Sequence, residues 1–270
     1  EASDDPAALG PQDAVLVTVK SPALPAVAAG IAPLLGPRTA VAFVMNGIPW
    51  WYFDRHGGPH DGMRLEEADP GGALREAVGI ERCIGGVIYS ACEVVAPGVV
   101  RSEHGNNRVV LGEPEGRVSE RAEALAALLR AGGMPTEASA DIRSELWCKL
   151  VGNLSNAPLC VLSGHGVRDT FADPVLRAAA RRSAEEARAV ALALGCEVPA
   201  EVVERVASIN MAHKPSILQD LELGRPMEVE TLFALPLKLA RLAGVATPQL
   251  DLLVALAKQA ARARGLYPAG

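Results

Sequence analysis

The sequence predicts an α/β domain built on a parallel sheet, followed by an all-helical domain. Two apolar, valine-rich runs, Ala14–Val19 and Thr39–Met45, have the length and composition of strands that are buried on both faces of a parallel sheet. A helical segment over Pro22–Leu35, closed by a Gly-Pro pair, lies between them, so the order indicates a βαβ unit with a right-handed crossover. Beyond residue 139 the apolar pattern has a helical period, and we therefore predict domains over 1–139 and 140–270.

The rest of the first domain is also predicted to contain strands and helices. Apolar runs predict further strands at Cys83–Ala91, Val99–His104 and Arg108–Leu111, with a turn at Asn106-Asn107. A helix is predicted over 119–130, because Ser119 has the side chain of a helix N-cap and a Gly-Gly pair ends the segment.

The second domain is predicted to consist of helices that Gly and Pro residues separate. We expect these helices near residues 142–156, 173–194, 198–212, 228–243 and 247–264. An α/β half followed by a helical half is the layout of a nucleotide-binding domain joined to a domain for substrate binding and dimerisation. This layout is compatible with a homodimer.

Composition and charge exclude several classes of function. The net charge is −6 and no Lys/Arg-rich run occurs, whereas a nucleic-acid-binding protein normally shows a basic patch. No apolar stretch approaches the ~20 residues of a membrane span, and the start lacks the pattern of a signal peptide. The five cysteines are scattered without CxxC spacing, which predicts reduced thiols in a cytoplasmic protein.

A lysine and an asparagine share one face of the first helix of the second domain. Asp141 is expected to cap this helix, and Lys149 and Asn153 then lie one turn apart on a mostly apolar surface. In one interpretation the lysine only extends its charge to water from an amphipathic edge. In the other, its ammonium donates a proton to a carbonyl oxygen as hydride reaches the carbon, with a pKa lowered by partial burial.

Two further polar residues flank a Gly-Arg-Pro break in the second domain. Ser216 begins a short helix, where an N-cap role would explain it. Glu228 lies near the start of the next helix, where the helix dipole favours an acidic residue. Taken singly, each residue is explained by helix termination as well as by a binding site.

Polar residues also follow the first two predicted strands. Lys20 comes after Ala14–Val19, and Asn46 begins the loop Asn46–Phe53, which holds four consecutive aromatic residues. Open α/β sheets bind ligands at the carboxyl ends of their strands, so both residues are candidates for ligand contacts. The aromatic residues are expected either to line a pocket or to cover the core.

Five segments in order resemble the ketopantoate reductase (2-dehydropantoate 2-reductase) family. They are VTVKS, MNGI, SELWCKLVGN, KPSILQD and GRPMEVE, and the resemblance covers essentially the whole chain. This family joins a Rossmann-type NADPH-binding domain to a helical C-terminal domain, with the active site in the cleft between them. The resemblance therefore implies an NADP-dependent oxidoreductase of the type used in pantothenate biosynthesis, which reduces a 2-keto acid to a 2-hydroxy acid.

The resemblance also implies roles for particular residues. Lys149 would be the general acid. The residues that contact substrate would be Asn153, Ser216 and Glu228. The residues on the nicotinamide side of the cleft would be Lys20 and Asn46.

Two departures from the family pattern lie near this site. Members commonly carry a second asparagine directly before a proline, but here Ala157 precedes Pro158 and the nearest asparagine is Asn156. One residue along a helix turns a side chain by about 100°, so we expect altered substrate contacts. The loop NGIPWWYF is also closer to a broad branch of reductase-like paralogues than to the enzyme of pantothenate synthesis.

A larger departure concerns the start of the chain. The family opens with a strand and a Gly-x-Gly-x-x-Gly turn that receives the cofactor diphosphate, and no such motif occurs here. Neither Gly57-Gly58 nor Gly85-Gly86 has its spacing. Because Glu1 opens the sequence on a polar segment that feeds a strand, we expect a truncated or renumbered start and an N-terminally incomplete Rossmann-type domain.

Other functions remain alternatives to the keto acid reductase. One is a ligand-binding or dimerisation protein that keeps the fold without catalysis, and another is a different hydroxyacid dehydrogenase of the same architecture. A metal site is not expected, because the ligand-type residues His56, His60 and Asp61 lie in a Gly/Pro loop without a partner cluster.

Overall fold

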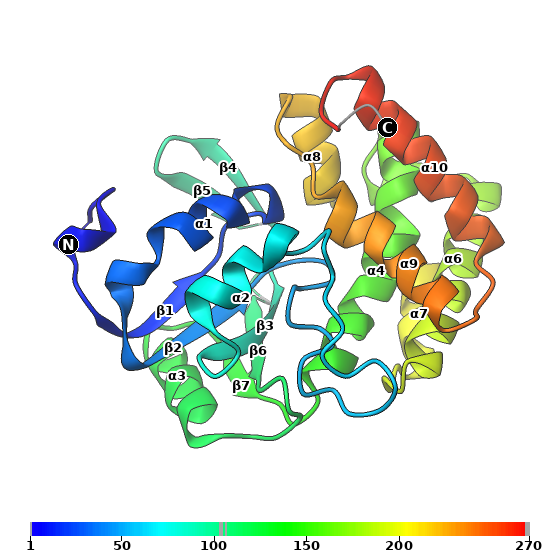
Figure 1. Ribbon diagram of the computed structural model, residues 1–270. Coiled ribbons are helices and arrows are strands. Elements are labelled where there is room, and N and C mark those ends of the chain that lie inside the picture. The colour runs from blue at the N-terminus through cyan, green and yellow to red at the C-terminus, as the bar shows by residue number, and fades with distance from the viewer. Residues whose placement is uncertain (1, 103–104, 106, 268–270) are drawn as a thin grey trace. The chain divides into compact units, whose positions relative to one another are not determined.

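The computed structural model describes residues 2–102, 105 and 107–267 of the 270-residue chain. Contacts within the chain divide it into two compact units, Glu1–Arg143 and Ser144–Gly270 (Figure 1). The first unit is an α/β domain and the second is helical, so the predicted fold class is confirmed. We keep the boundary at 139/140 as a proposal, because the long helix α4 (Ile142–Ser163) begins directly after it.

The first unit is built on a mostly parallel sheet of five strands. The strands lie in the order β1 (Gln12–Val17), β2 (Leu35–Val44), β3 (Cys83–Tyr89), β6 (Arg108–Gly112) and β7 (Thr136–Ala138). All neighbours pair in parallel except β3 and β6, which are antiparallel. The crossover from β1 to β2 is the predicted βαβ unit.

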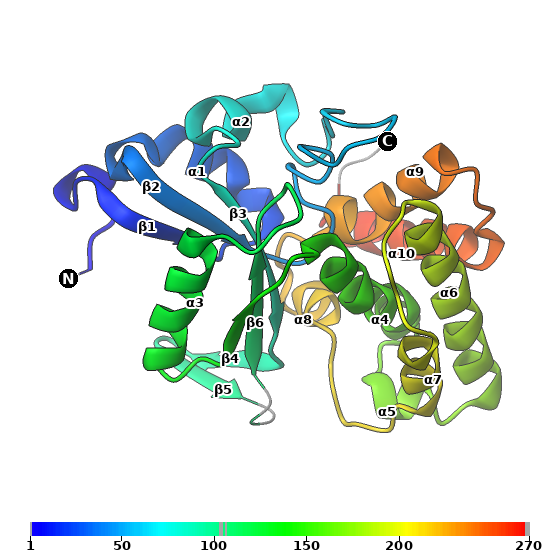
Figure 2. The same cartoon turned by 90° about the horizontal axis from the view of Figure 1, so that it is seen from below.

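Helices cover both faces of this sheet. The helices α1 (Leu24–Gly30) and α2 (Ala73–Val78) lie on one face, and α3 (Glu120–Ala131) lies on the other (Figure 2). Ser119 is the N-cap of α3, as predicted, because its side chain accepts a hydrogen bond from the amide of Ala122.

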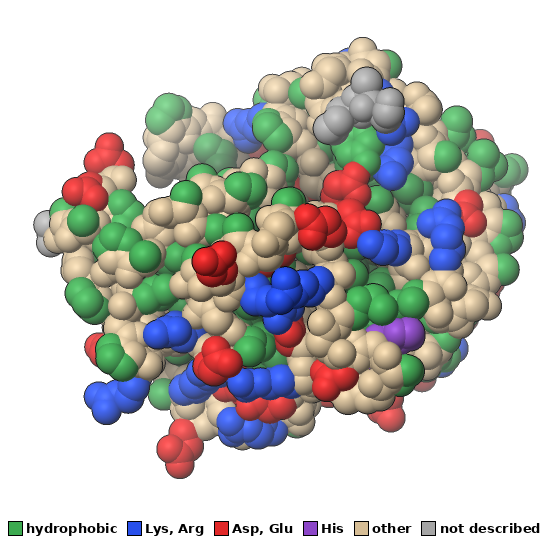
Figure 3. All heavy atoms as spheres, in the orientation of Figure 1, with side chains coloured by type: hydrophobic (Ala, Val, Ile, Leu, Met, Phe, Trp, Pro, Cys, Tyr) green, Lys and Arg blue, Asp and Glu red, His purple; other side chains and the backbone are tan. Residues whose placement is uncertain are grey.

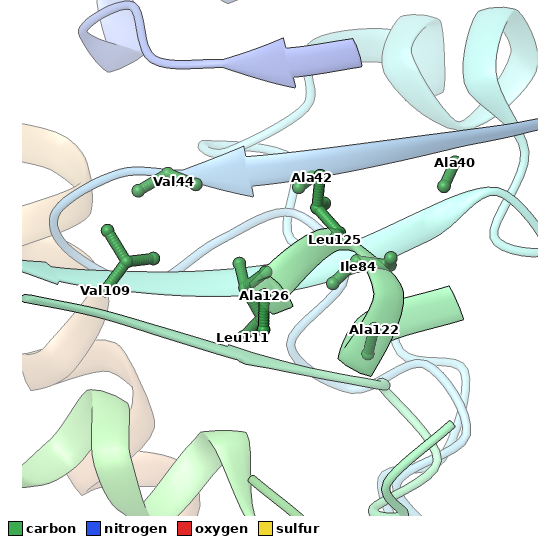
Figure 4. Close-up of a cluster of buried hydrophobic side chains, with 9 residues drawn as sticks. All are labelled: Ala40, Ala42, Val44, Ile84, Val109, Leu111, Ala122, Leu125 and Ala126. Atoms are coloured by element: carbon green, nitrogen blue, oxygen red, sulfur yellow. The ribbon is translucent and has the colours of Figure 1, made fainter. Parts of the chain in front are cut away.

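The core on the α3 side is made of small and branched apolar residues. Alanine and valine side chains of β2 face Ile84, Val109 and Leu111 of the neighbouring strands (Figure 4). The residues Ala122, Leu125 and Ala126 of α3 close this layer. Small residues on both sides let the helix pack closely on the sheet.

Two predictions about the first βαβ unit were wrong. The strand β1 was expected to be buried on both faces, yet it is the edge of the described sheet and Leu16 is 41% exposed. The helix predicted over Pro22–Leu35 is divided into a turn of 3-10 helix at Ser21–Ala23, α1, and a second turn at Ala32–Leu34. Proline within this segment, notably Pro33, prevents one continuous helix.

A two-stranded hairpin forms a separate small sheet. It pairs β4 (Cys92–Ala96), which was not predicted, with β5 (Val99–Ser102). Residues 103 and 104 of the predicted strand and residue 106 of the predicted turn lie outside the described residues.

The second unit contains the predicted helices, with changed ends. In chain order they are α4, α5 (Val167–Thr170), α6 (Pro174–Ala193), α7 (Ala200–Ser208), α8 (Ser216–Leu223), a π-helical turn (Glu230–Ala234), α9 (Leu235–Leu242) and α10 (Pro248–Ala263). The helix α4 continues through Pro158 instead of ending near residue 156. In the described chain, no helix has the length and apolar character that crossing a membrane requires.

Close packing between β3 and the aromatic loop makes Gly85 a sensitive position. A Cβ atom at Gly85 would lie 2.6 Å from Cη2 of Trp51 and 3.1 Å from Ile142. Replacing Gly85 with Ala should therefore lower the free energy of unfolding by about 1–3 kcal/mol through overpacking. Urea unfolding followed by tryptophan fluorescence measures this change.

The matched control is Gly30→Ala at the end of α1, where a Cβ would meet nothing within 4 Å. The free energy of unfolding of this variant should lie within about 0.5 kcal/mol of the parent value or slightly above it. Equal stability of the two variants would contradict the assignment of Trp51 as the packing partner of Gly85.

Candidate active site

The helix α4 carries a partly exposed lysine next to buried apolar residues. Trp147, Leu150 and Val151 are buried and fix the opposite side of the helix in the core of the second unit. Lys149 and Asn153 are only partly buried and lie one turn apart. The sequence pattern and the helix therefore place both side chains on the same face.

The environment of Lys149 changes its acidity. Burial lowers the pKa of the Lys149 ammonium to about 8, because water no longer solvates the charge fully. The negative charge of Glu228 acts in the opposite direction and raises the pKa of Lys149. Lys149 is thus a stronger acid than a solvated lysine, and at neutral pH it remains mostly protonated.

Glu228 is held at the beginning of a helix that contains a π-helical turn. Glu228 is only 3% exposed. Its backbone carbonyl oxygen accepts a hydrogen bond from the backbone amide of Leu232 at 3.1 Å. The position at a helix start, which the sequence indicated, is confirmed. The tertiary structure adds the interaction between the Glu228 and Lys149 charges, two residues far apart in the chain.

Ser216 is the first residue of α8 and not its N-cap. The N-cap is Pro215, which makes no side-chain cap, so the prediction that Ser216 caps the helix was wrong. The hydroxyl group is consequently not used to terminate this helix. Ser216 is partly exposed, and Gly224 ends α8 in the left-handed conformation with φ of 63°.

Lys20 and Asn46 both follow carboxyl ends of neighbouring parallel strands. β1 ends at Val17 and β2 ends at Val44, and the two strands pair with Val17 opposite Phe43. Lys20 is exposed and Asn46 is partly buried. An ammonium and an amide at this edge fit contacts with an anionic or amide group of a nucleotide, because this is the edge at which α/β sheets bind ligands.

The aromatic residues of the loop after β2 cover the core of the first unit. Trp50, Trp51, Tyr52 and Phe53 are each no more than 2% exposed. Trp50 packs edge-on against Phe43 of β2 with ring centroids 5.6 Å apart. Of the two roles considered for these residues, the structure supports packing in the core.

Arg143 is a buried residue of this region that the sequence pattern did not reveal. Its guanidinium donates hydrogen bonds to the carbonyl oxygens of Tyr52, Pro114 and Asp54 at 2.7, 2.6 and 2.7 Å. Asp54 in turn forms a paired ion contact with Arg75 at 2.5 and 2.6 Å. An arginine in the first turn of an apolar helix was the available signal for such an anchoring role.

The glycine pairs of the first unit do not form a phosphate-binding turn. Gly85 and Gly86 lie within β3, where Cβ atoms would collide with Trp51 and Val44. Gly57 and Gly58 lie in a loop, with φ of 72° and 76°. The residues that fit a nucleotide cofactor are therefore those at the strand ends, and a diphosphate cradle is not among the features of the described chain.

Among the described residues, neither the charged surface nor the loop with His56 and His60 contains a further candidate site. No group of three or more His, Cys, Asp or Glu side chains in the described ranges is arranged to hold a metal ion. Basic and acidic side chains are interspersed on the face seen in Figure 3, in agreement with the absence of a basic run in the sequence.

Family models match both parts of the chain. The model described as "Ketopantoate reductase PanE/ApbA C terminal" matches residues 141–261, and the model described as "Ketopantoate reductase PanE/ApbA" matches residues 1–50. A 2-dehydropantoate 2-reductase from Mesorhizobium japonicum is 44% identical over 96% of this chain and 80% of its own length.

Solved structures show the same likeness. A crystal structure from Ralstonia solanacearum MolK2, assigned as a ketopantoate reductase, has a TM-score of 0.88 and 40% identity, covering 98% of this chain and 81% of that one. The 2-dehydropantoate 2-reductase of Geobacter metallireducens has a TM-score of 0.81 and 31% identity, covering 94% and 79%. A D-mandelate dehydrogenase, at 21% identity and a TM-score of 0.78, shares the fold. This chain therefore belongs to the ketopantoate reductase family of NADP-dependent oxidoreductases.

Proposed function

We propose that this protein reduces a 2-keto acid of the ketopantoate type to the 2-hydroxy acid with NADPH, and that Lys149 is the general acid. The observation that carries this proposal is the lowered pKa of Lys149, about 8, together with the opposing charge of the buried Glu228. Family membership and relatives named 2-dehydropantoate 2-reductase support the substrate class.

The chemistry assigned to Lys149 follows from its environment. When bound, NADPH would supply the hydride that adds to the keto carbon of the substrate. The ammonium of Lys149 holds its proton toward the keto oxygen and transfers it as negative charge develops there. Partial desolvation makes this transfer easier than it would be from a lysine in water, since the ammonium gains less from solvation.

The neighbouring residues are proposed to hold the substrate and the lysine. Glu228 keeps Lys149 protonated, because its negative charge stabilises the ammonium against the cost of burial. Asn153 lies one turn from Lys149 and can bind either the substrate or the lysine side chain. Ser216 offers a hydroxyl that does not cap its helix, and we assign it a contact with the substrate.

The residues proposed to hold the cofactor on its nicotinamide side are Lys20 and Asn46. Both lie past the carboxyl ends of adjacent parallel strands, and their ammonium and amide groups suit polar cofactor atoms. We also propose a homodimer in the cytoplasm. The helical second unit supports the homodimer. The absence of disulfides among the five cysteines, all of which lie in the described ranges, supports the cytoplasmic location.

A panel of keto acids, assayed with NADPH and the full-length protein, tests the proposed function. Ketopantoate and related 2-keto acids should be reduced, and titration with the protein should change NADPH fluorescence. A preference for an aromatic 2-keto acid would favour a mandelate dehydrogenase type instead. The absence of both turnover and NADPH binding would favour a non-catalytic protein of this fold.

The pH dependence of the reaction should depend on Glu228. Keto acid reduction needs protonated Lys149, so kcat/KM should fall as the pH rises through about 8. Replacing Glu228 with Gln removes the charge that raises the pKa of Lys149. The fall of kcat/KM with rising pH should therefore occur at a pH lower by about one unit or more. Initial rates over a pH series measure this shift.

The matched control is Glu222→Gln on α8. Glu222 forms an exposed ion pair with Lys214 at 2.7 Å, so its loss should leave the falling limb where it is. A limb that stays unmoved in Glu228→Gln, or moves equally in both variants, would show that Glu228 does not set the acidity of Lys149.

A further inference from the structure

The hydroxyl group of Tyr267 reaches a glutamate that lies two residues beyond Glu228. Tyr267 follows α10, where Gly265 takes the left-handed conformation, with φ of 68°, and turns the chain away from the helix axis. The Tyr267 hydroxyl donates a hydrogen bond to Oε1 of Glu230. A residue beyond α10 is thereby tied to the segment that carries Glu228, although the two are far apart in the chain.

Glu230 is the first residue of the π-helical turn that precedes α9. The amide of Leu235 donates to the carbonyl oxygen of Glu230, five positions back, where an α-helix would use the residue four positions back. The turn therefore holds one residue more than an α-helical turn. One residue corresponds to about 100° of rotation in a helix, so the π-helical turn sets the direction in which Glu228 leaves the backbone relative to α9.

The residues after this turn are fixed by packing. Leu235, Leu237 and Leu239 of α9 are buried, so a rotation of α9 would disturb the core of the second unit. If the π-helical turn relaxed to α-helical geometry, the rotation would fall on the residues before it, which include Glu228. Because π-helical turns are rare, this one needs an interaction that favours it over the α-helical form.

The hydroxyl of Tyr267 is a suitable anchor for the turn. Burial and the hydrogen bond to Glu230 raise the pKa of Tyr267 to about 12, so the hydroxyl remains a donor over the pH range of enzyme assays. The positive charge of Arg262 acts in the opposite direction on this pKa. Arg262 and Lys258 lie 5.2 and 5.5 Å from the centroid of the Tyr267 ring, so these cations contact the face of the ring and leave the hydroxyl to Glu230.

We propose that Tyr267 is a positioning residue of the active site. Its hydrogen bond to Glu230 holds the π-helical turn, and this turn keeps the carboxylate of Glu228 where its charge acts on Lys149. Tyr267 thus acts through Glu228, without a contact of its own to the keto acid. The inference rests on the proposed function, because it takes Lys149 to be the general acid.

The variant Tyr267→Phe tests this role, because it removes the hydroxyl and keeps the ring. In the full-length protein, kcat/KM for ketopantoate should fall with rising pH about 0.5–1 unit earlier than in the parent, since Glu228 no longer raises the pKa of Lys149 fully. In the background of Glu228→Gln the same change should add no further shift, because the charge that it displaces is already absent. No shift, a shift to higher pH, or a shift that adds in full to that of Glu228→Gln would overturn the proposal.

Two substitutions of Glu230 separate positioning from an effect of charge. Glu230→Gln removes the charge but keeps an acceptor for the Tyr267 hydroxyl, so its pH profile should match that of the parent. Glu230→Leu has a similar size but no acceptor, so its profile should shift as in Tyr267→Phe. Equal profiles in the two Glu230 variants, shifted or not, would contradict the role of the hydrogen bond.

The matched control for the loss of a hydroxyl is Ser208→Ala. Ser208 is exposed at the end of α7, where its hydroxyl donates to the carbonyl oxygen of Arg205 at 3.2 Å. Its pH profile should equal that of the parent, and a shift as large as that of Tyr267→Phe would overturn the assignment. If Tyr267→Phe does not fold, the comparison of Glu230→Gln with Glu230→Leu still decides whether the hydrogen bond positions Glu228.

Chemical labelling of Lys149 separates this inference from the proposed function. Acetic anhydride reacts with the neutral amine, so the pH dependence of Lys149 acetylation, measured by mass spectrometry, reports the pKa of Lys149 without substrate or cofactor. The midpoint should lie near pH 8 in the parent and at lower pH in Tyr267→Phe. If the parent reduces no keto acid, the proposed function fails, but the labelling still decides the role of Tyr267. Equal midpoints in parent and variant would overturn the inference even if ketopantoate is reduced.

Discussion

Replacing Lys149 with Ala is expected to lower kcat for keto acid reduction by about 10²–10⁴-fold, the usual contribution of a general acid. The ammonium that would donate the proton is lost, and the alkoxide would have to take its proton from water. Substrate binding should be less affected than turnover, because Asn153 and Ser216 remain in place. Steady-state kinetics with ketopantoate and NADPH measure both quantities.

Two further variants distinguish acid catalysis from a simple need for positive charge. Lys149→Arg keeps the charge, but the guanidinium pKa is too high for proton donation at neutral pH, so its turnover should be nearly as low as that of the alanine variant. Lys258→Ala changes a lysine of α10 that lies over the ring of Tyr267, and its turnover should be normal. Near-native turnover in Lys149→Ala would refute the mechanism.

Replacing Arg143 with Met should reduce the free energy of unfolding by about 3–5 kcal/mol, the largest effect on stability that we expect. The guanidinium donates hydrogen bonds to the carbonyl oxygens of Tyr52, Pro114 and Asp54, and all three residues are buried. Methionine fills a similar volume but leaves these acceptors without donors. Urea unfolding, followed by the fluorescence of the nearby Trp50 and Trp51, provides the measurement.

The comparison for Arg143 is an exposed arginine. Arg117 pairs with Glu115 at 3.0 Å with its side chain 60% exposed, so Arg117→Met should cost less than about 1 kcal/mol. If Arg143→Met is no less stable than Arg117→Met, the hydrogen bonds of Arg143 do not stabilise the loop that contains the aromatic residues.

Local features of the fold were largely predictable. Helix periodicity and the breaks at Gly and Pro located the helices of the second unit, because a helix buries one stripe of its surface. The N-cap at Ser119 was also predicted, since it depends on the neighbouring four residues. The hairpin strand β4 was missed because its residues are mostly exposed and lack the burial pattern that identifies a strand.

Features that depend on distant neighbours were predicted less well. β1 has the sequence of a buried central strand, yet whether a strand has neighbours on both sides is decided by the other strands present. The end of α4 was placed too early because proline usually interrupts a helix, whereas packing of the surrounding apolar residues keeps the helix continuous here.

The sequence by itself determined that Lys149 and Asn153 share a helix face, because helical spacing is a property of the backbone. It also determined the family, through motifs that stand in a fixed order. Only the tertiary structure decided that Lys149 has a pKa of about 8, since burial and the charge of Glu228 come from residues distant in sequence. For the same reason, it alone placed the aromatic loop in the core and left the amide oxygen of Asn156 without a donor among the described residues.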